Sequence, residues 1–356
     1  MFYLSTALLA FASVASATKS LTISTSAPAS VSDVSALEVV TTVVNSGDET
    51  VKLLNDPRTV LSSWATESFT VVNSAGISAD FTGVAVRYIP SVTAKKGADH
   101  AFTVLAPGES VSVTHELGNF FNFTNAGESK YTITPLSTIQ AVEEDGTLTT
   151  IGAHVTPASV VLSGQLSSLS KLSSSSLGGA ADGRSSARSL SKRASYTSCT
   201  ASRQSINAQA ISDSSAIAQA SISHLEANPS GSTTQTTWYG TFATSRYRGT
   251  LSAFEGLATA PASWTYDCSC TDSDTYAYVY PSTYGKVYLC GYYWQCPATG
   301  SGSRADTIIH EGTHFPQILG TDDYAYGETA CKSLAKSNPA RAYLNADNHA
   351  FFSDYV

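Results

Sequence analysis

The residues with the clearest chemical potential are His310, Glu311 and His314, which form the pattern H-E-x-x-H. On an α-helix, positions i and i+4 lie one turn apart on the same face, so both imidazoles can bind one metal ion. Glu311 lies beside them, where it can take a proton from a metal-bound water. The pattern is typical of zinc peptidases. A surface helix with two histidines and a glutamate is the plainer interpretation, and the sequence after the motif argues against it.

A catalytic zinc ion usually takes three protein ligands and one water, so the chain must supply a third ligand. A metzincin needs Gly and then His three and six residues after the second His, where this chain has Gln317 and Gly320. A thermolysin-like site takes a Glu from a following helix, and the candidate Glu328 is too close to the motif. The third option is the segment Gly320–Gly327, with the sequence Gly-Thr-Asp-Asp-Tyr-Ala-Tyr-Gly.

This segment resembles the G-T-x-D-x-x-Y-G motif of the deuterolysin family, the fungal aspzincins. The resemblance implies that Asp323, and not Asp322, is the third zinc ligand, and that Tyr326 lies near the scissile carbonyl. It covers roughly residues 194–356. Three segments are similar to the peptidyl-Lys metalloendopeptidase branch of that family: Ser263–Cys270, Tyr276–Pro281 and Asn345–His349.

Together these residues predict a zinc-dependent endopeptidase with one catalytic Zn²⁺ ion, held by His310, His314 and Asp323. Zinc lowers the pKa of a bound water to about 7. Glu311 is then expected to act as the general base, taking that proton and passing it to the leaving amine. Tyr326 is expected to donate a hydrogen bond to the tetrahedral intermediate.

The lysine-specific branch of the family uses an acidic pair near the C-terminus to receive the side chain of the residue after the cut. Asp347 matches the first member of that pair, whereas Ala350 stands where those members carry Glu. A preference for Lys after the cut is therefore a hypothesis, with broader deuterolysin-like cleavage as its alternative. Helix capping is the plainer role for Asp347.

Helices and one hairpin must position these residues. The active-site helix is predicted to start near Ser303 and to end just past His314, because Pro316 disfavours helical geometry at the residue before it. A hairpin of Thr275–Tyr280 and Lys286–Cys290 would supply the edge strand that pairs with an extended substrate. Apolar periodicity predicts three further helices: one through Ile206 to Leu225 that ends at Asn228-Pro229, one over Thr244–Leu257, and a last one from near Tyr326 through Ala335.

The length, net charge and N-terminal segment of the chain predict a secreted protein of two domains. A chain of 356 residues predicts about two domains. The net charge of −8 argues against partners such as nucleic acid and anionic membranes, which call for basic patches. Residues 1–17 resemble a signal peptide, since Leu4–Val14 is apolar but too short to span a bilayer and Ala15-Ser16-Ala17 is a cleavage site of the A-x-A type.

Residues 18–162 carry short alternating strands between turn signals, which favours an all-β sandwich. Residues 163–193 form a Ser-rich linker that ends in Lys192-Arg193, a pair that kexin-type secretory proteases cut. We therefore predict a zymogen in which the sandwich is a propeptide that assists folding or blocks the cleft. A mature protein that keeps both domains is the alternative.

All six cysteines follow the linker, and an even count in a secreted domain implies disulfides. Cys268 and Cys270 share one face of a strand and need different partners. The resemblance implies the pairs Cys199–Cys268 and Cys270–Cys290. The two remaining cysteines, Cys296 and Cys331, would then form a third bridge. A cysteine-rich zinc site is disfavoured because no C-x-x-C pair exists and the compartment is oxidising.

The expected fold is α+β: a zincin-type domain over residues 194–356, mainly helical with a small antiparallel sheet, after an all-β propeptide domain. We expect an extracellular monomer that acts on protein or peptide substrates. A secreted binding module on a zincin fold, with zinc structural or absent, is the alternative from a different class. A cell-wall protein or adhesin with the linker as a stalk leaves the metal triad unexplained.

Overall fold

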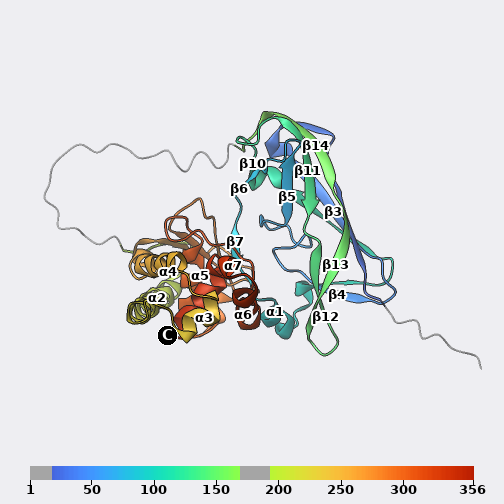
Figure 1. Ribbon diagram of the computed structural model, residues 1–356. Coiled ribbons are helices and arrows are strands. Elements are labelled where there is room, and N and C mark those ends of the chain that lie inside the picture. Colours follow the sequence, from blue (N-terminus) through green and yellow to red (C-terminus); the bar gives the residue numbers. More distant parts are fainter. Residues whose placement is uncertain (1–17, 169–192) are drawn as a thin grey trace, which may run out of the picture.

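The computed structural model describes residues 18–168 and 193–356, which form two bodies that lie side by side (Figure 1). The first body is built of strands with one short helix, and the second is mainly helical around a small sheet, so the α+β class is correct. The predicted signal peptide, residues 1–17, and Lys192 of the processing pair lie outside the described residues. Among the described helices, none is both long and apolar enough to cross a membrane.

The first body, which we call the N-terminal body, contains a seven-stranded sheet in the order β8-β4-β12-β13-β1-β3-β9 and a four-stranded sheet in the order β2-β14-β11-β5. Its elements are β1 Leu21–Ser26, β2 Ser30–Asp33, β3 Glu38–Asn45, β4 Val51–Leu54, β5 Phe69–Asn73, β6 Asp80–Phe81, β7 Ala85–Arg87, α1 Pro90–Lys96, β8 Phe102–Leu105, β9 Ser110–Glu116, β10 Phe121–Asn122, β11 Ser129–Pro135, β12 Thr138–Val142, β13 Leu148–Thr156 and β14 Ala158–Gln165.

Alternation along the strands explains how these sheets pack. In β3, every second residue is buried and the residues between them are more exposed, which is the period of two expected for a strand with one face on a core. Residues from both sheets share one hydrophobic core, for example Val39 and Val43 from the larger sheet and Ile133 and Val160 from the smaller one. Two sheets on one core fit the predicted sandwich.

Three details of this body differ from the prediction. The body is not purely β, because Pro90 starts the short helix α1 that ends at Gly97 in the left-handed conformation. Strand β14 continues to Gln165, so the first residues of the predicted linker belong to the sheet. Strand β7 leaves its own body and joins the sheet of the second body.

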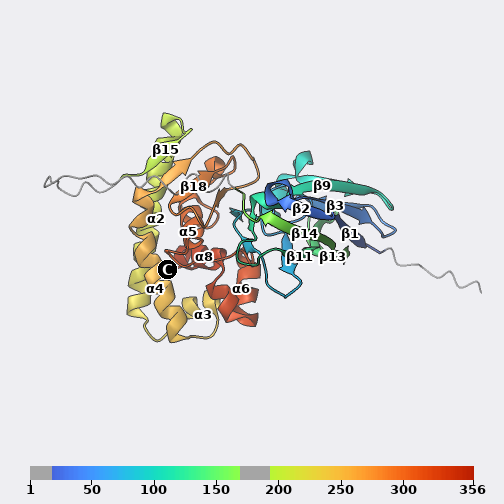
Figure 2. The ribbon, with the colours of Figure 1, turned by 90° about the horizontal axis from the view of Figure 1, so that it is seen from above.

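The second body, which we call the catalytic body, contains β15 Ser195–Thr197, α2 Ala201–Ala227, α3 Thr233–Tyr239, α4 Thr244–Leu257, β16 Thr265–Asp267, β17 Ala277–Val279, β18 Lys286–Leu289, α5 Arg304–Thr313, α6 Glu328–Ser337, α7 Pro339–Tyr343 and α8 Ala346–Asp354. Its core shares no buried residue with the core of the N-terminal body. Figure 2 shows α6 on the side that faces the N-terminal body and α2 on the far side.

The predicted helices α2, α4, α5 and α6 are present, but α6 is not the last helix, and α3, α7 and α8 were missed. Helix α8 lacks an amphipathic stripe because all residues from Ala346 to Ser353 are buried. Helices α3 and α7 have only seven and five residues, too few for a clear apolar period. These three helices therefore have no apolar period from which they could be predicted.

The sheet of the catalytic body has the order β15-β16-β18-β17-β7. The sheet is mixed: β15–β16 and β16–β18 pair parallel, whereas β18–β17 and β17–β7 pair antiparallel, so the prediction of a purely antiparallel sheet was wrong. Helices α2, α3 and α4 connect β15 to β16, and parallel neighbours require such a crossover. The predicted hairpin is β17 and β18, and the outer edge of β17 is occupied by β7 of the N-terminal body.

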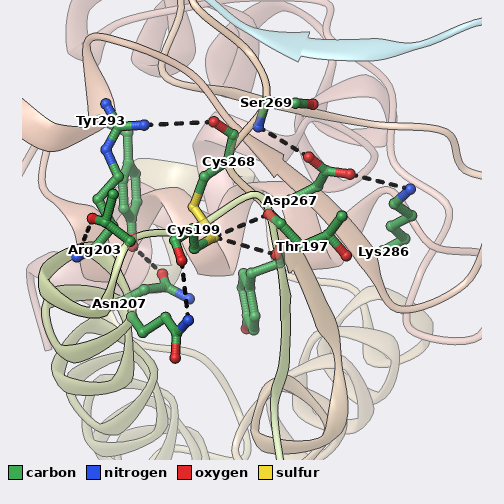
Figure 3. Close-up of a disulfide and its surroundings, with 12 residues drawn as sticks. Thr197, Cys199, Arg203, Asn207, Asp267, Cys268, Ser269, Lys286 and Tyr293 are labelled. Carbon is green, nitrogen blue, oxygen red and sulfur yellow. Dashed lines mark hydrogen bonds and ion pairs between the residues drawn. A yellow bond between two sulfur atoms is a disulfide. The ribbon is translucent and has the colours of Figure 1, made fainter.

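Two disulfides hold the catalytic body. Cys199 bonds to Cys268, which joins the start of α2 to the end of β16, and Figure 3 shows this bridge among Arg203, Asp267 and Lys286. The second bridge is Cys270–Cys290. Both pairs are the ones implied by the resemblance.

The third predicted bridge is absent, because Cys296 and Cys331 are both free and buried. They lie in different packed clusters: Cys296 with Ile89 and Tyr276, and Cys331 in the main core of the catalytic body. The even number of cysteines therefore did not mean that the last two form a disulfide.

Candidate active site

Helix α5 carries the H-E-x-x-H motif through the centre of the catalytic body. The side chain of Ser303 accepts a hydrogen bond from the backbone N–H of Asp306 and so caps the helix, as the sequence predicted. Every residue from Ala305 to Thr313 is buried. Gly312, the first variable position of the motif, lies against α4 and Trp264, and a Cβ there would be only 2.8 Å from the Trp264 ring. The motif helix therefore needs glycine where its neighbours approach.

Asp323 reaches the two histidines of the motif. Its Oδ1 atom lies 3.3 Å from Nε2 of His310 and 3.6 Å from Nε2 of His314. These three ligand atoms lie within 4.8 Å of one another. All three are buried and make no hydrogen bond. Because buried polar atoms normally have partners, this arrangement fits a shared cation with two nitrogen ligands and one oxygen ligand, a set that zinc accepts.

Hydrogen bonds on the far side of each imidazole fix the two rings. Nδ1 of His314 donates to the backbone carbonyl of Thr321 over 2.8 Å, which leaves its Nε2 as the nitrogen with a free lone pair. Nδ1 of His310 lies 2.8 Å from Oδ1 of Asp347. Such carboxylate and carbonyl partners are what orients metal-binding histidines in proteins.

Neighbouring histidines favour an anionic Asp323, and burial raises the proton affinity of Glu311. Although burial alone would raise the pKa of Asp323, the neighbouring His314 and His310 lower it well below its usual range. Burial raises the pKa of Glu311 to about 8. Both carboxylate oxygens of Glu311 are buried and make no hydrogen bond, so this side chain has no structural partner.

Asp322, the neighbour of the proposed ligand, has partners other than the histidines. Its carboxylate accepts a hydrogen bond from the Tyr324 hydroxyl over 2.6 Å. The peptide N–H of Asp322 donates to the carbonyl of Leu344, which ties this loop to the segment before α8. The structure thus brings Asp323, and not Asp322, to the motif.

The hydroxyl of Tyr326 is hydrogen-bonded to a backbone carbonyl. The hydroxyl donates to the carbonyl oxygen of Val86 in β7 over 2.6 Å. The guanidinium of Arg58, also from the N-terminal body, lies 3.8 Å from the centre of the Tyr326 ring. The family resemblance implies that Tyr326 lies near the scissile carbonyl, and in the structure its hydroxyl contacts a peptide carbonyl of the chain itself.

Asp347, which is predicted to receive a basic side chain of the substrate, contacts both the metal site and a basic residue of the N-terminal body. It is fully buried at the start of α8, with Oδ1 on the ligand side chain of His310 and Oδ2 accepting from the N–H of Gly327. Its Oδ1 also lies 3.7 Å from Nε of Arg87, a residue of β7. Asp347 is therefore mainly engaged with the metal-site histidine.

Arg87 and Asp306 are, like Arg58, charged residues near the site that were not predicted from the sequence. Arg87 is buried and pairs with Asp306 of α5. Arg87 could have been noticed in the sequence because it is a charged residue within the apolar run Val84–Ile89. Asp306 lies four residues before His310, which puts it one helical turn away, and this spacing was available in the sequence.

Comparisons with known proteins indicate one family. Residues 224–354 match the model of the aspzincin family, which is described as lysine-specific metallo-endopeptidase. A peptidyl-Lys metalloendopeptidase from Armillaria mellea is 43% identical over 342 residues, which cover 95% of this chain and 93% of that protein. The chain belongs to the aspzincin family.

As an aspzincin, the chain is a zinc metalloendopeptidase. A peptidyl-Lys metalloendopeptidase from Grifola frondosa is 37% identical over 350 residues, which cover 98% of this aspzincin and 96% of that protein. A solved zinc peptidase from Grifola frondosa is 42% identical, covers 44% of this chain and 96% of its own, and has a TM-score of 0.43.

Proposed function

We propose that this aspzincin is a secreted endopeptidase made as a zymogen, with one zinc ion held by His310, His314 and Asp323. The observation that carries the proposal is the convergence of three buried ligand atoms that have no other partner. When bound there, zinc would polarise the scissile carbonyl and lower the pKa of a water molecule. The two disulfides of the catalytic body and the predicted signal peptide support an extracellular location.

Glu311 acts as the general base in this proposal. It takes a proton from the attacking water and gives it to the leaving amine. Its raised pKa and its lack of hydrogen-bond partners support the role, because a buried carboxylate with no structural contact is free to exchange a proton. Tyr326 donates its hydroxyl to the carbonyl oxygen as negative charge develops there.

The N-terminal body acts as a propeptide in this proposal. Strand β7 pairs antiparallel with β17 along the edge where an extended substrate would bind, with Val86 opposite Tyr278. A kexin-type protease would cut after Arg193, which is exposed. N-terminal sequencing of the secreted protein tests this step, and a start at Ala194 is expected. A start at Thr18 would contradict it.

Removal of zinc is expected to abolish peptidase activity of the protein cut after Arg193. A chelator would take the ion from His310, His314 and Asp323, and added Zn²⁺ would restore hydrolysis. The reason is that the ion is the Lewis acid of the proposed reaction. The measurement is hydrolysis of a peptide mixture with and without chelator. Activity that resists complete metal removal would contradict the proposed metal chemistry, and absence of cleavage despite bound zinc would favour a binding module.

Replacing Asp347 with Asn is expected to weaken zinc affinity by about 10-fold to 100-fold, as loss of a carboxylate behind a ligand histidine does in other zinc sites. The physical reason is that Asp347 holds the ring of His310 through Nδ1. Competition with a chromophoric chelator measures the dissociation constant. Asp322→Asn is the matched control, since that carboxylate contacts Tyr324 and not a ligand. Equal zinc affinity in both variants would remove the positioning role.

A further inference from the structure

A basic side chain of the N-terminal body fills a pocket of the catalytic body. Arg87 ends β7, which Figure 1 shows between the two bodies, and its side chain is completely buried. Strand β7 runs antiparallel to β17, with Arg87 opposite Ala277. A charged residue carried into another body on a single strand needs a specific set of partners.

The neighbouring contacts place Arg87 where the residue after a cut would lie. The carbonyl of Val86, the residue before Arg87, accepts the hydrogen bond of the Tyr326 hydroxyl. Val86 and Ala85 also line a cavity with Asp323. With Tyr326 in its proposed role at the scissile carbonyl, the peptide group between Val86 and Arg87 corresponds to a scissile bond, and Arg87 corresponds to the residue after the cut.

Asp306 is the main partner of the cation in this pocket. Nη1 of Arg87 lies 2.7 Å from Oδ1 of Asp306 and Nη2 lies 2.9 Å from Oδ2, so the two groups form a two-pronged pair. Nη1 also donates to Thr307 over 2.8 Å, and the guanidinium lies 5.2 Å from the centre of the Tyr276 ring. Asp347 is farther away, at 3.7 Å from Nε.

The acidic residue that pairs with the cation in this pocket therefore differs from the acidic pair implied by the family resemblance. Ala350, at the position of the second acid of the lysine-specific branch, is buried and offers no charge. The oxygens of Asp347 are already used by His310 and Gly327. Asp306 instead comes from the active-site helix, where Ser303 and Gly302 hold it through the peptide N–H of Asp306 and the carboxylate respectively.

We propose that Asp306 is the specificity-determining carboxylate of this enzyme and that its pocket accepts arginine as well as lysine after the cut. The proposal rests on the proposed function, because it assigns a substrate class to that same cleft. A planar guanidinium matches a carboxylate through two parallel hydrogen bonds, whereas an ammonium acts as a point charge. A neutral side chain would leave buried Asp306 without a cation, so the pocket disfavours it.

The test uses the processed protein freed of its N-terminal body and three peptides that differ only in the residue after the cut, which is Arg, Lys or Ala. The wild type is expected to cleave the Arg and Lys peptides with kcat/KM values within about tenfold of each other. Asp306→Asn is expected to lower both values by about 100-fold. It should not lower cleavage of the Ala peptide, because the neutral pocket no longer disfavours a neutral side chain, and this retained cleavage shows that the variant is folded.

Glu255→Gln, which removes an exposed carboxylate from α4, is the control and should change none of the three values. Cleavage of the Arg peptide at less than one hundredth of the Lys value would overturn the arginine assignment. An unchanged ratio of basic to Ala cleavage in Asp306→Asn would overturn the role of Asp306.

A binding measurement separates this inference from the proposed function. A labelled peptide with the sequence of residues 82–90 is titrated into processed Glu311→Gln protein, where turnover is not required. The Arg87 peptide is expected to bind at least about 30-fold more tightly than its Arg87→Ala form, and Asp306→Asn should remove the difference. Equal binding of the two peptides would overturn the inference even if the enzyme is active, and a difference would support it even if no peptide is cut.

Discussion

Glu311→Gln is expected to keep zinc bound and to lower kcat by about 10³-fold or more, since a general base commonly contributes 10²-fold to 10⁴-fold and this one serves two proton transfers. The amide has the size of the carboxylate but cannot accept the proton. Because the carboxylate oxygens make no hydrogen bond, the substitution removes no structural contact. A neutral group is also easier to bury than a charged one, so the folded state should not lose stability.

Two measurements on the processed variant check this result: kcat with a peptide substrate, and zinc content per chain by elemental analysis. Glu328→Gln is the control, because Glu328 at the start of α6 is partly exposed and pairs with Lys332 and Tyr355, not with a residue of the site. Its activity should stay within about twofold of the wild type. If Glu311→Gln retained a tenth of the activity with zinc bound, Glu311 would not be the base.

Local pattern was enough to find the motif helix α5 and the helices α2, α4 and α6. The i and i+4 spacing of His310 and His314 depends only on helical geometry, and Pro316 marks the end of the helix. The short strands of residues 18–162 were predicted in the same way, because alternation along a strand also depends only on local geometry. Asp323 needed the resemblance to a known family, because a loop of nine residues after His314 allows many conformations.

Contacts between distant segments were not predictable in this way. Asp347 is 37 residues from His310, and Arg87 is 219 residues from Asp306. Strand β7 has only three residues and belongs to a sheet whose other strands begin at Ser195. Neither hydrophobic period nor turn signals indicate which sheet a short strand joins, so the strand that fills the cleft was not identified from the sequence.

A chain that cannot be cut at Lys192-Arg193 is expected to have less than about a hundredth of the peptidase activity of the cut protein. In the uncut chain, β7 occupies the edge of β17, Val86 takes the Tyr326 hydroxyl and Arg87 fills the Asp306 pocket. A substrate would have to displace all three contacts at once. The measurement is hydrolysis of a small peptide by the Lys192→Ala, Arg193→Ala chain before and after cleavage at an introduced site in the linker.

Adding Arg87→Ala to that uncut chain is expected to raise its activity by about 10²-fold. Removal of one partner of a buried ion pair costs about 3–5 kcal/mol, because the other charge stays buried without a partner, and each 1.4 kcal/mol is tenfold in the equilibrium between covered and open cleft. Lys96→Ala is the matched control. Lys96 also joins the two bodies, through Asp274, but it is partly exposed, and pairs of this kind contribute about 0–1 kcal/mol.

The pair of variants separates two ways in which the N-terminal body could silence the enzyme. If Arg87→Ala opens the cleft and Lys96→Ala does not, the block comes from the one strand that lies in the cleft. If neither variant gains activity, general contact between the two bodies suffices and Arg87 is only a buried structural ion pair. If the uncut parent is as active as the cut protein, the N-terminal body is no inhibitor, and the contacts of β7 serve assembly of the sheet alone.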